Sequence, residues 1–168
     1  MTKRAGTSPP PANEERPKRH GRHGQGTGTA AAPAAARPLR VLVVDDDRVD
    51  RIALTRALGQ TGFDVTVGEA DGVLAAIDLL AGSSFDCVLL DYNLPDGDGL
   101  TFLRGLRGAG ISVTVVMITG QQDSAVASDL VEAGAADYIP KGLFTPGLLA
   151  QTLARLFGDP SFAKDSIP

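Results

Sequence analysis

Short apolar runs of strand length alternate with segments of helical period along most of this chain, and this alternation constrains the fold more than any other feature. Strands separated by helices predict βα units and a parallel sheet. Three runs are continuously apolar, as is typical of strands buried on both faces, whereas one alternates in period two and one ends at a proline, which suits sheet edges. The predicted strands are Leu39–Asp45, Phe63–Val67, Phe85–Leu90, Ser112–Ile118 and Ala136–Ile139.

Five helices are predicted from apolar residues at helical spacing and from their end signals. They span Arg48–Leu58, a segment capped by Asp71, a short segment after residue 97, a segment that begins at Asp123 or Ser124, and a segment from the Thr145-Pro146 pair to Gly158. The side chains expected to face the core are Ile52, Leu54, Ala57, Leu58, Val73, Leu74, Ile77, Leu80, Leu100, Leu103, Leu106, Val126, Ala127, Leu130, Val131, Leu149, Leu153 and Leu156. Five strands and five helices fit a doubly wound, flavodoxin-like (βα)5 sandwich of three layers, with strand order 2-1-3-4-5.

Composition divides the chain into three predicted segments. Residues 1–37 carry a net charge of +5 and contain no Val, Ile, Leu or Phe, so they cannot bury enough apolar surface to offset the entropy lost on ordering. Residues 38–168 carry a net charge of −9 and nearly all of the apolar side chains. We therefore expect a disordered basic arm rich in Pro, Gly and Ala at 1–37, a folded domain at 38–158 and a short tail at 159–168.

The sequence contains no apolar stretch close to the roughly 20 residues that cross a bilayer, and its start lacks the apolar core of a signal peptide. We therefore expect no membrane insertion and a cytoplasmic location. The single cysteine, Cys87, lies in an apolar run and is predicted to be a core residue. The basic arm is interpreted as a solvated tail, with contact to nucleic acid through residues 1–37 as the less favoured alternative.

Polar side chains follow the predicted strands at their carboxyl ends, where open parallel sheets bind ligands. Asp45 and Asp46 end the first strand, Asp91 follows the third, Thr119 follows the fourth, and Lys141 comes shortly after the fifth. The first and third strands are neighbours in the predicted order, and two carboxylates about 5 Å apart repel by roughly 3 kcal/mol at an effective dielectric constant near 20. Oxygen ligands with room for water suit Mg²⁺ better than Zn²⁺ or Ca²⁺, so the cluster predicts a magnesium site.

Four segments together resemble the receiver domain of two-component response regulators, here of a stand-alone type. They are VLVVDDD, CVLLDYNLPDGDGL, VVMITG and DYIPKG. Within them, Asp46, Asp91, Thr119 and Lys141 are separated by 45, 28 and 22 residues. The resemblance covers about residues 38–158, which is nearly all of the predicted folded part.

The resemblance implies a phosphoryl-transfer site in which Asp91 is the phosphoacceptor. The phosphoryl donor would be a phosphohistidine of a histidine kinase or of a histidine phosphotransfer protein. The resemblance also implies that Mg²⁺ is bound by Asp46 and Asp91, by Asp45 through water, and by the backbone carbonyl of Asn93. This ion would offset the repulsion between the carboxylate and the phosphoryl anion.

The resemblance further implies a conformational switch that regulates a protein partner. Lys141 and Thr119 would contact phosphoryl oxygens, and Tyr138 would turn inward as Thr119 moves toward the phosphate. The face that changes would comprise residues 123–133, 136–139 and 145–157. Only ten residues follow Gly158, so we expect output through another protein, or a role as a phosphorelay shuttle or phosphate sink, without a separate enzyme domain.

Two positions depart from the family pattern or add to it. Gly142 follows Lys141, where the family usually has proline, and Asp47 is an additional acid that we interpret as a helix cap. An alternative class, the Mg²⁺-dependent phosphohydrolases with an aspartate nucleophile, requires a second aspartate two positions after Asp91. Because Asn93 occupies that position, the receiver interpretation is favoured.

Overall fold

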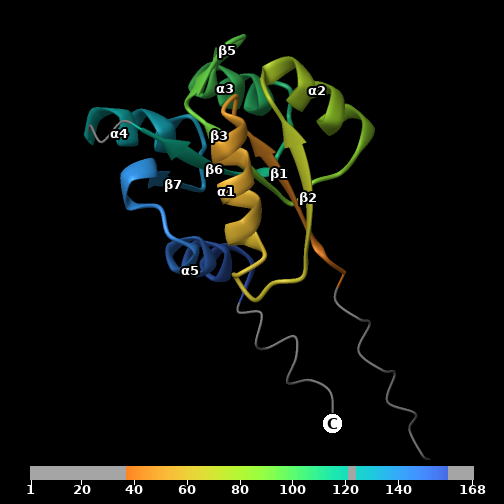
Figure 1. The fold of residues 1–168 in the computed structure, drawn as a ribbon. Helices are drawn as coiled ribbons and strands as arrows, with labels where there is room; N and C mark the ends of the chain where they lie inside the picture. The colour runs from red at the N-terminus through yellow and green to blue at the C-terminus, as the bar shows by residue number, and fades with distance from the viewer. Residues whose placement is uncertain (1–36, 121–123, 159–168) are drawn as a thin grey trace, which may run out of the picture. The chain divides into compact units, whose positions relative to one another are not determined.

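The computed structural model describes residues 37–120 and 124–158, and its centre is a five-stranded parallel sheet (Figure 1). The strands are β1 (Leu39–Val44), β2 (Val65–Ala70), β3 (Cys87–Asp91), β6 (Thr114–Thr119) and β7 (Asp137–Pro140). Their order is β2-β1-β3-β6-β7. This order confirms the predicted 2-1-3-4-5, because β6 and β7 are the fourth and fifth strands of this sheet.

Helices cover both faces of the sheet (Figure 1). They are α1 (Arg48–Leu58), α2 (Val73–Gly82), α3 (Gly99–Gly108), α4 (Ser124–Glu132) and α5 (Pro146–Phe157). In β1, Leu42 and Val44 pack in one buried cluster with residues of α2, α3 and α4, whereas Val41 and Val43 pack in the other with residues of α1 and α5. Because side chains alternate along a strand, each continuous apolar run supplies both layers of the core.

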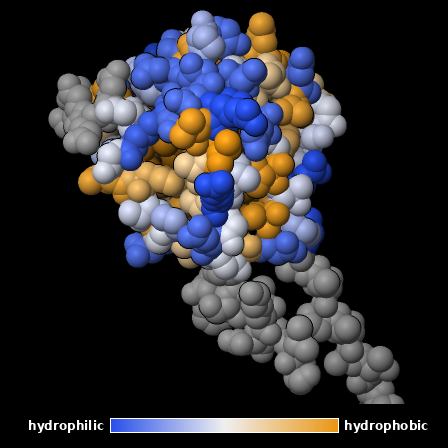
Figure 2. Space-filling view, viewed as in Figure 1, coloured by the Kyte–Doolittle hydropathy of each residue, from blue (hydrophilic) through white to orange (hydrophobic). Residues whose placement is uncertain are grey.

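The helices bury a narrower stripe than their apolar patterns predict. Four side chains expected in the core are exposed, namely Ile52 (38%), Leu74 (68%), Ile77 (46%) and Val131 (64%). In α2 the fully buried residue is Ala76, and Leu79 and Leu80 are partly buried against the same cluster. A helix that lies on a sheet buries one side only. Figure 2, viewed over α1, accordingly shows apolar side chains interspersed with polar ones at the surface.

The N-terminus of α2 is capped from another part of the chain, and the predicted Asp71 cap is wrong. The carboxylate of Asp96 accepts hydrogen bonds from the backbone N–H groups of Val73 (2.8 Å) and Leu74 (2.9 Å). Asp96 reaches this position from the loop after β3, which contains a two-stranded antiparallel ribbon of β4 (Asn93–Leu94) and β5 (Gly97–Asp98). A Cβ atom on Gly72 would lie 2.7 Å from the Asp96 carboxylate, so glycine permits this close approach.

Other local predictions are confirmed. Asp47 caps α1 by accepting a hydrogen bond from Val49 N, and Thr145 caps α5 with Pro146 as the first helical residue. Cys87 is completely buried, and burial raises the pKa of its thiol to about 12. None of the helices in the described residues is both long and apolar enough to span a bilayer.

Three predictions concern residues that the structure does not describe. The basic arm up to residue 36, the tail at 159–168 and the placement of Asp123 at the start of α4 lie outside the described residues. Arg37, at the end of the predicted arm, is described, and it forms an ion pair with Asp86 at 2.6 Å.

Candidate functional site

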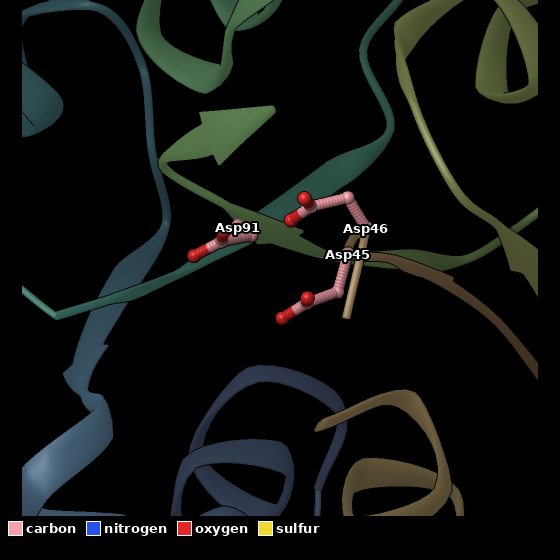
Figure 3. Close-up of side chains that lie close together, drawn as sticks. All are labelled: Asp45, Asp46 and Asp91. Atoms are coloured by element: carbon pink, nitrogen blue, oxygen red, sulfur yellow. The ribbon is translucent and has the colours of Figure 1, made fainter. Parts of the chain in front are cut away.

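Three aspartate side chains meet at the carboxyl ends of β1 and β3. Asp45 and Asp46 directly follow β1, Asp91 is the last residue of β3, and the two strands are paired in the sheet. One carboxylate oxygen of each lies within 4.8 Å of those of the other two, and the three side chains lie close together at the strand ends (Figure 3). Asp45 and Asp91 are buried, whereas Asp46 is exposed. The structure therefore brings together the acidic residues that the sequence predicted as one cluster.

Lys141 lies against this cluster from the 3-10 turn η1 (Lys141–Leu143), which directly follows β7. Its Nζ atom lies 2.9 Å from Asp45 Oδ2, 3.2 Å from Asp91 Oδ1 and 2.7 Å from Asp50 Oδ2. Burial favours the neutral amine, but the hydrogen bonds to Asp50 and Asp45 and the charge of Asp91 raise the pKa of Lys141. A single lysine therefore stays charged and offsets part of the negative charge of three carboxylates.

The electrostatic environment of Asp91 is unfavourable to its charge. Burial raises the pKa of the Asp91 carboxyl, the Lys141 charge opposes this shift, and the Asp45 charge adds to it. Although Asp91 Oδ1 is buried beside Lys141, it accepts no well-oriented hydrogen bond from any residue in the described part of the chain. A buried acceptor without a donor calls for a further partner. A hard divalent cation fits this atom, because the neighbouring ligands are also carboxylate oxygens.

Backbone contacts fix the loop that carries the acidic pair. Asp45 Oδ1 accepts a hydrogen bond from Asp47 N at 2.9 Å. Arg51, in α1, donates through Nη1 to the carbonyl oxygens of Asp45 (2.8 Å) and Asp46 (3.1 Å). Its Nε also lies 3.4 Å from a carboxylate oxygen of Glu69 in β2. The first two turns of α1 thereby hold the acidic loop in place.

The remaining predicted site residues lie on neighbouring strands. Thr119 is the last residue of β6 and is 1% exposed, and the preceding Ile118 is in register with Asp91. Asn93 opens β4, two residues after Asp91, and its side chain is exposed. Tyr138 lies in β7, outside the acidic cluster, and its side chain is 37% exposed. Thr119 therefore ends the strand beside that of Asp91, whereas Tyr138 lies at the surface.

Gly99, at the first position of α3, was not predicted to be important but shapes the site. A Cβ atom on Gly99 would lie 2.3 Å from the backbone oxygen of Asp91. Gly99 N also donates a hydrogen bond to the carbonyl oxygen of Tyr92 at 2.7 Å. The start of α3 thus packs directly on the backbone of the predicted acceptor. The Asp-Gly pair before an apolar helix is the only sequence signal of this close approach.

Comparison with known proteins gives the family. Residues 41–153 match the response regulator receiver domain. The chain belongs to this family. It is 40% identical over 119 residues to the response regulator MprA of Mycobacterium sp. (strain KMS), a match that covers 71% of this chain and 51% of the relative. This receiver domain chain thus spans about half the length of the curated relatives that it matches.

Solved receiver domain structures have the same fold. The chemotaxis response regulator CheY4 of Vibrio cholerae superposes with a TM-score of 0.65 at 24% identity, over 72% of this chain and 100% of that one. The BeF3-activated DrrB receiver domain superposes with a TM-score of 0.63 at 26% identity, over 71% of this chain and 97% of that one. The predictions of a receiver domain and of a flavodoxin-like fold are confirmed. The acidic cluster fits the Mg²⁺ site of a receiver domain in a two-component system.

Proposed function

We propose that this receiver domain accepts a phosphoryl group on Asp91 from the phosphohistidine of a histidine kinase or a histidine phosphotransfer protein. The observation that carries the proposal is the buried Asp91 Oδ1, which accepts no well-oriented hydrogen bond from the described residues and lies 3.2 Å from the Lys141 ammonium. An aspartate kept only for stability would have its oxygens satisfied by the protein.

The transfer uses one carboxylate oxygen of Asp91 as the nucleophile. This oxygen forms a bond to phosphorus while the P–N bond of the phosphohistidine breaks, and the imidazole nitrogen keeps the electron pair of that bond. Lys141 balances negative charge that the phosphoryl oxygens bring to the site. The Thr119 hydroxyl, at the end of the adjacent strand, donates to a phosphoryl oxygen.

The proposed cation ligands are the carboxylates of Asp46 and Asp91, the carboxylate of Asp45 through water, and the backbone carbonyl of Asn93. Mg²⁺ bound there supplies positive charge that offsets the repulsion between a carboxylate and an incoming phosphoryl group. The described residues present one lysine and three carboxylates at this point, so the protein alone leaves the site negative.

Signalling requires that the phosphoryl group stabilise one conformation more than another. We propose that Thr119 moves toward the phosphoryl group, that Tyr138 turns inward, and that the face of α4, β7 and α5 changes for a downstream protein target. The exposed side chain of Tyr138 fits the state before phosphorylation. The cytoplasmic location expected from the sequence stays a prediction.

Labelling of the full chain with acetyl phosphate and Mg²⁺ tests this proposal. We expect one hydroxylamine-sensitive phosphoryl group on the wild type and on Asp78→Asn, a matched change at an exposed site on α2, and none on Asp91→Asn. Chelation of Mg²⁺ with EDTA should abolish labelling. Labelling of Asp91→Asn to the same extent as the wild type would refute the assignment.

A second measurement tests the switch. The DrrB receiver domain was solved in a BeF3-activated form, and we expect beryllofluoride to bind at Asp91 in this chain. Amide chemical shifts should then change at Thr119 and Tyr138 as well as at Asp91. Shifts confined to Asp91 and its immediate neighbours would contradict the proposed relay.

A further inference from the structure

A fourth carboxylate, Asp50, contacts the site through Lys141. Asp50 lies in the first turn of α1, and its Oδ2 atom is 2.7 Å from Lys141 Nζ, a shorter distance than those from Nζ to Asp45 (2.9 Å) and Asp91 (3.2 Å). Asp50 lies outside the three-carboxylate cluster that fits a metal ion. Its contact with the site is therefore with the lysine.

The donors of Lys141 can be counted. An ammonium group has three N–H donors. Asp45 and Asp50 each accept a hydrogen bond from Lys141 Nζ. Asp91 Oδ1 lies within ion-pair distance of Nζ, at 3.2 Å, but accepts no well-oriented hydrogen bond from it. This arrangement leaves one donor for an additional oxygen beside Asp91. Asp50 can therefore keep its hydrogen bond when a phosphoryl oxygen arrives.

The surroundings of Lys141 leave it freedom to move without this contact. Its side chain is 29% exposed, and the next residue in its turn is Gly142. A small cavity of about 70 Å³ lies beside it, lined by Asp45, Asp50, Ala53, Leu54, Ile118, Lys141 and Phe144. A long, flexible lysine next to unfilled space is poorly held by packing. An anchor on the rigid helix α1 restricts it.

We propose that Asp50 is a positioning residue that holds the Lys141 ammonium beside Asp91, so that the positive charge is in place when the phosphoryl group arrives. The inference rests on the proposed phosphorylation of Asp91. Preorganised charge is effective because it need not be reoriented during the reaction. A purely electrostatic role for Asp50 predicts the opposite change in rate. If Asp50 acted only by its negative charge, its removal would reduce repulsion of an anionic donor and would speed the reaction.

The test measures the initial rate of acyl phosphate formation at Asp91 from acetyl phosphate and Mg²⁺ in the full chain. We expect Asp50→Asn to slow labelling about two- to fivefold, the range for loss of a partly exposed ion pair. Asp50→Glu, which keeps the charge, should restore at least half of the wild-type rate. Asp78→Asn, which removes an exposed charge from α2, should label as the wild type does.

A double-mutant cycle separates positioning from a general structural role. In the Lys141→Ala background, Asp50→Asn should no longer slow labelling, because the residue that it positions is absent. An equal slowing in both backgrounds, or a rate in Asp50→Asn equal to or above that of the wild type, would overturn the inference. Failure of the wild type itself to label at Asp91 would instead refute the proposed function, so the two failures are distinguishable.

Discussion

Replacement of Gly99 by alanine tests whether the start of α3 must pack on the backbone of Asp91. The added Cβ would lie 2.3 Å from the Asp91 carbonyl oxygen and 3.0 Å from the Met117 methyl group. Ordinary contacts between carbon and oxygen begin at roughly 3.3 Å, so the two backbones must separate by about 1 Å. The carbonyl oxygen belongs to a buried strand and cannot rotate away as a side chain would.

The expected free-energy change combines two opposing effects. Overpacking of this kind costs about 3 kcal/mol, the upper end of the usual range, because backbone must move. Alanine gains up to about 1 kcal/mol over glycine from helix propensity. The net loss of stability is therefore about 2 kcal/mol, which lowers the urea midpoint by about 1 M at a typical slope.

Urea unfolding monitored by circular dichroism measures this loss of stability, and Gly105→Ala is the control. Gly105 lies in the same helix and is exposed, and nothing lies within 4 Å of a Cβ built on it. We expect Gly105→Ala to raise the midpoint through helix propensity alone. A midpoint for Gly99→Ala that equals or exceeds that of the wild type would refute the close-packing argument.

Three further predictions concern other contacts. Without Mg²⁺, Asp91→Asn should raise the melting temperature, because the Asp91 pKa is higher in the folded than in the unfolded state and the ionised carboxylate therefore destabilises the fold at neutral pH. Mg²⁺ at 100 times its dissociation constant should stabilise the wild type by about 2.7 kcal/mol and the variant far less. Arg107→Ala should cost about 2 kcal/mol in urea unfolding, because it leaves the carbonyl oxygens of Ile111, Val113 and Gly134 without their donor. Asp96→Ala should lower the urea midpoint at neutral pH. The Leu74 and Val73 N–H groups lower the Asp96 pKa, so the difference in midpoint between wild type and variant should shrink as the pH falls below the unfolded-state pKa of Asp96. A difference that stays constant with pH would contradict the cap.

The features that the sequence could predict are those set by the strand and helix periodicities of its apolar residues. The continuous apolar runs located β1, β3 and β6, and the contrast between these three runs and the two edge-like runs fitted the sheet order. Asp45, Asp46 and Asp91 were expected together because strand ends in a parallel sheet share one edge. These are consequences of backbone geometry, which does not depend on the identity of distant side chains.

The features that sequence missed depend on contacts between elements. Leu74 and Ile77 continue an apolar helical pattern, yet α2 buries only the stripe around Ala76. The cap on α2 comes from Asp96, 23 residues after Val73, because the ribbon after β3 folds over the helix end. The neighbouring Asp71 fits the usual local rule, but the orphan N–H groups of a helix can donate to any suitably placed carboxylate.

Asp50 illustrates the same limit at the functional site. Its place in the first turn of α1 suggests favourable interaction with the helix dipole, a role that requires no partner. In the sheet, β3 and β6 lie between β1, which precedes α1, and β7, which precedes Lys141. Only the folded structure therefore shows that Lys141 Nζ lies 2.7 Å from Asp50 Oδ2. Lys141 then faces Asp45, Asp50 and Asp91 together. Three carboxylates around one ammonium leave a net negative charge that a bound cation would reduce, as the proposed phosphorylation of Asp91 requires.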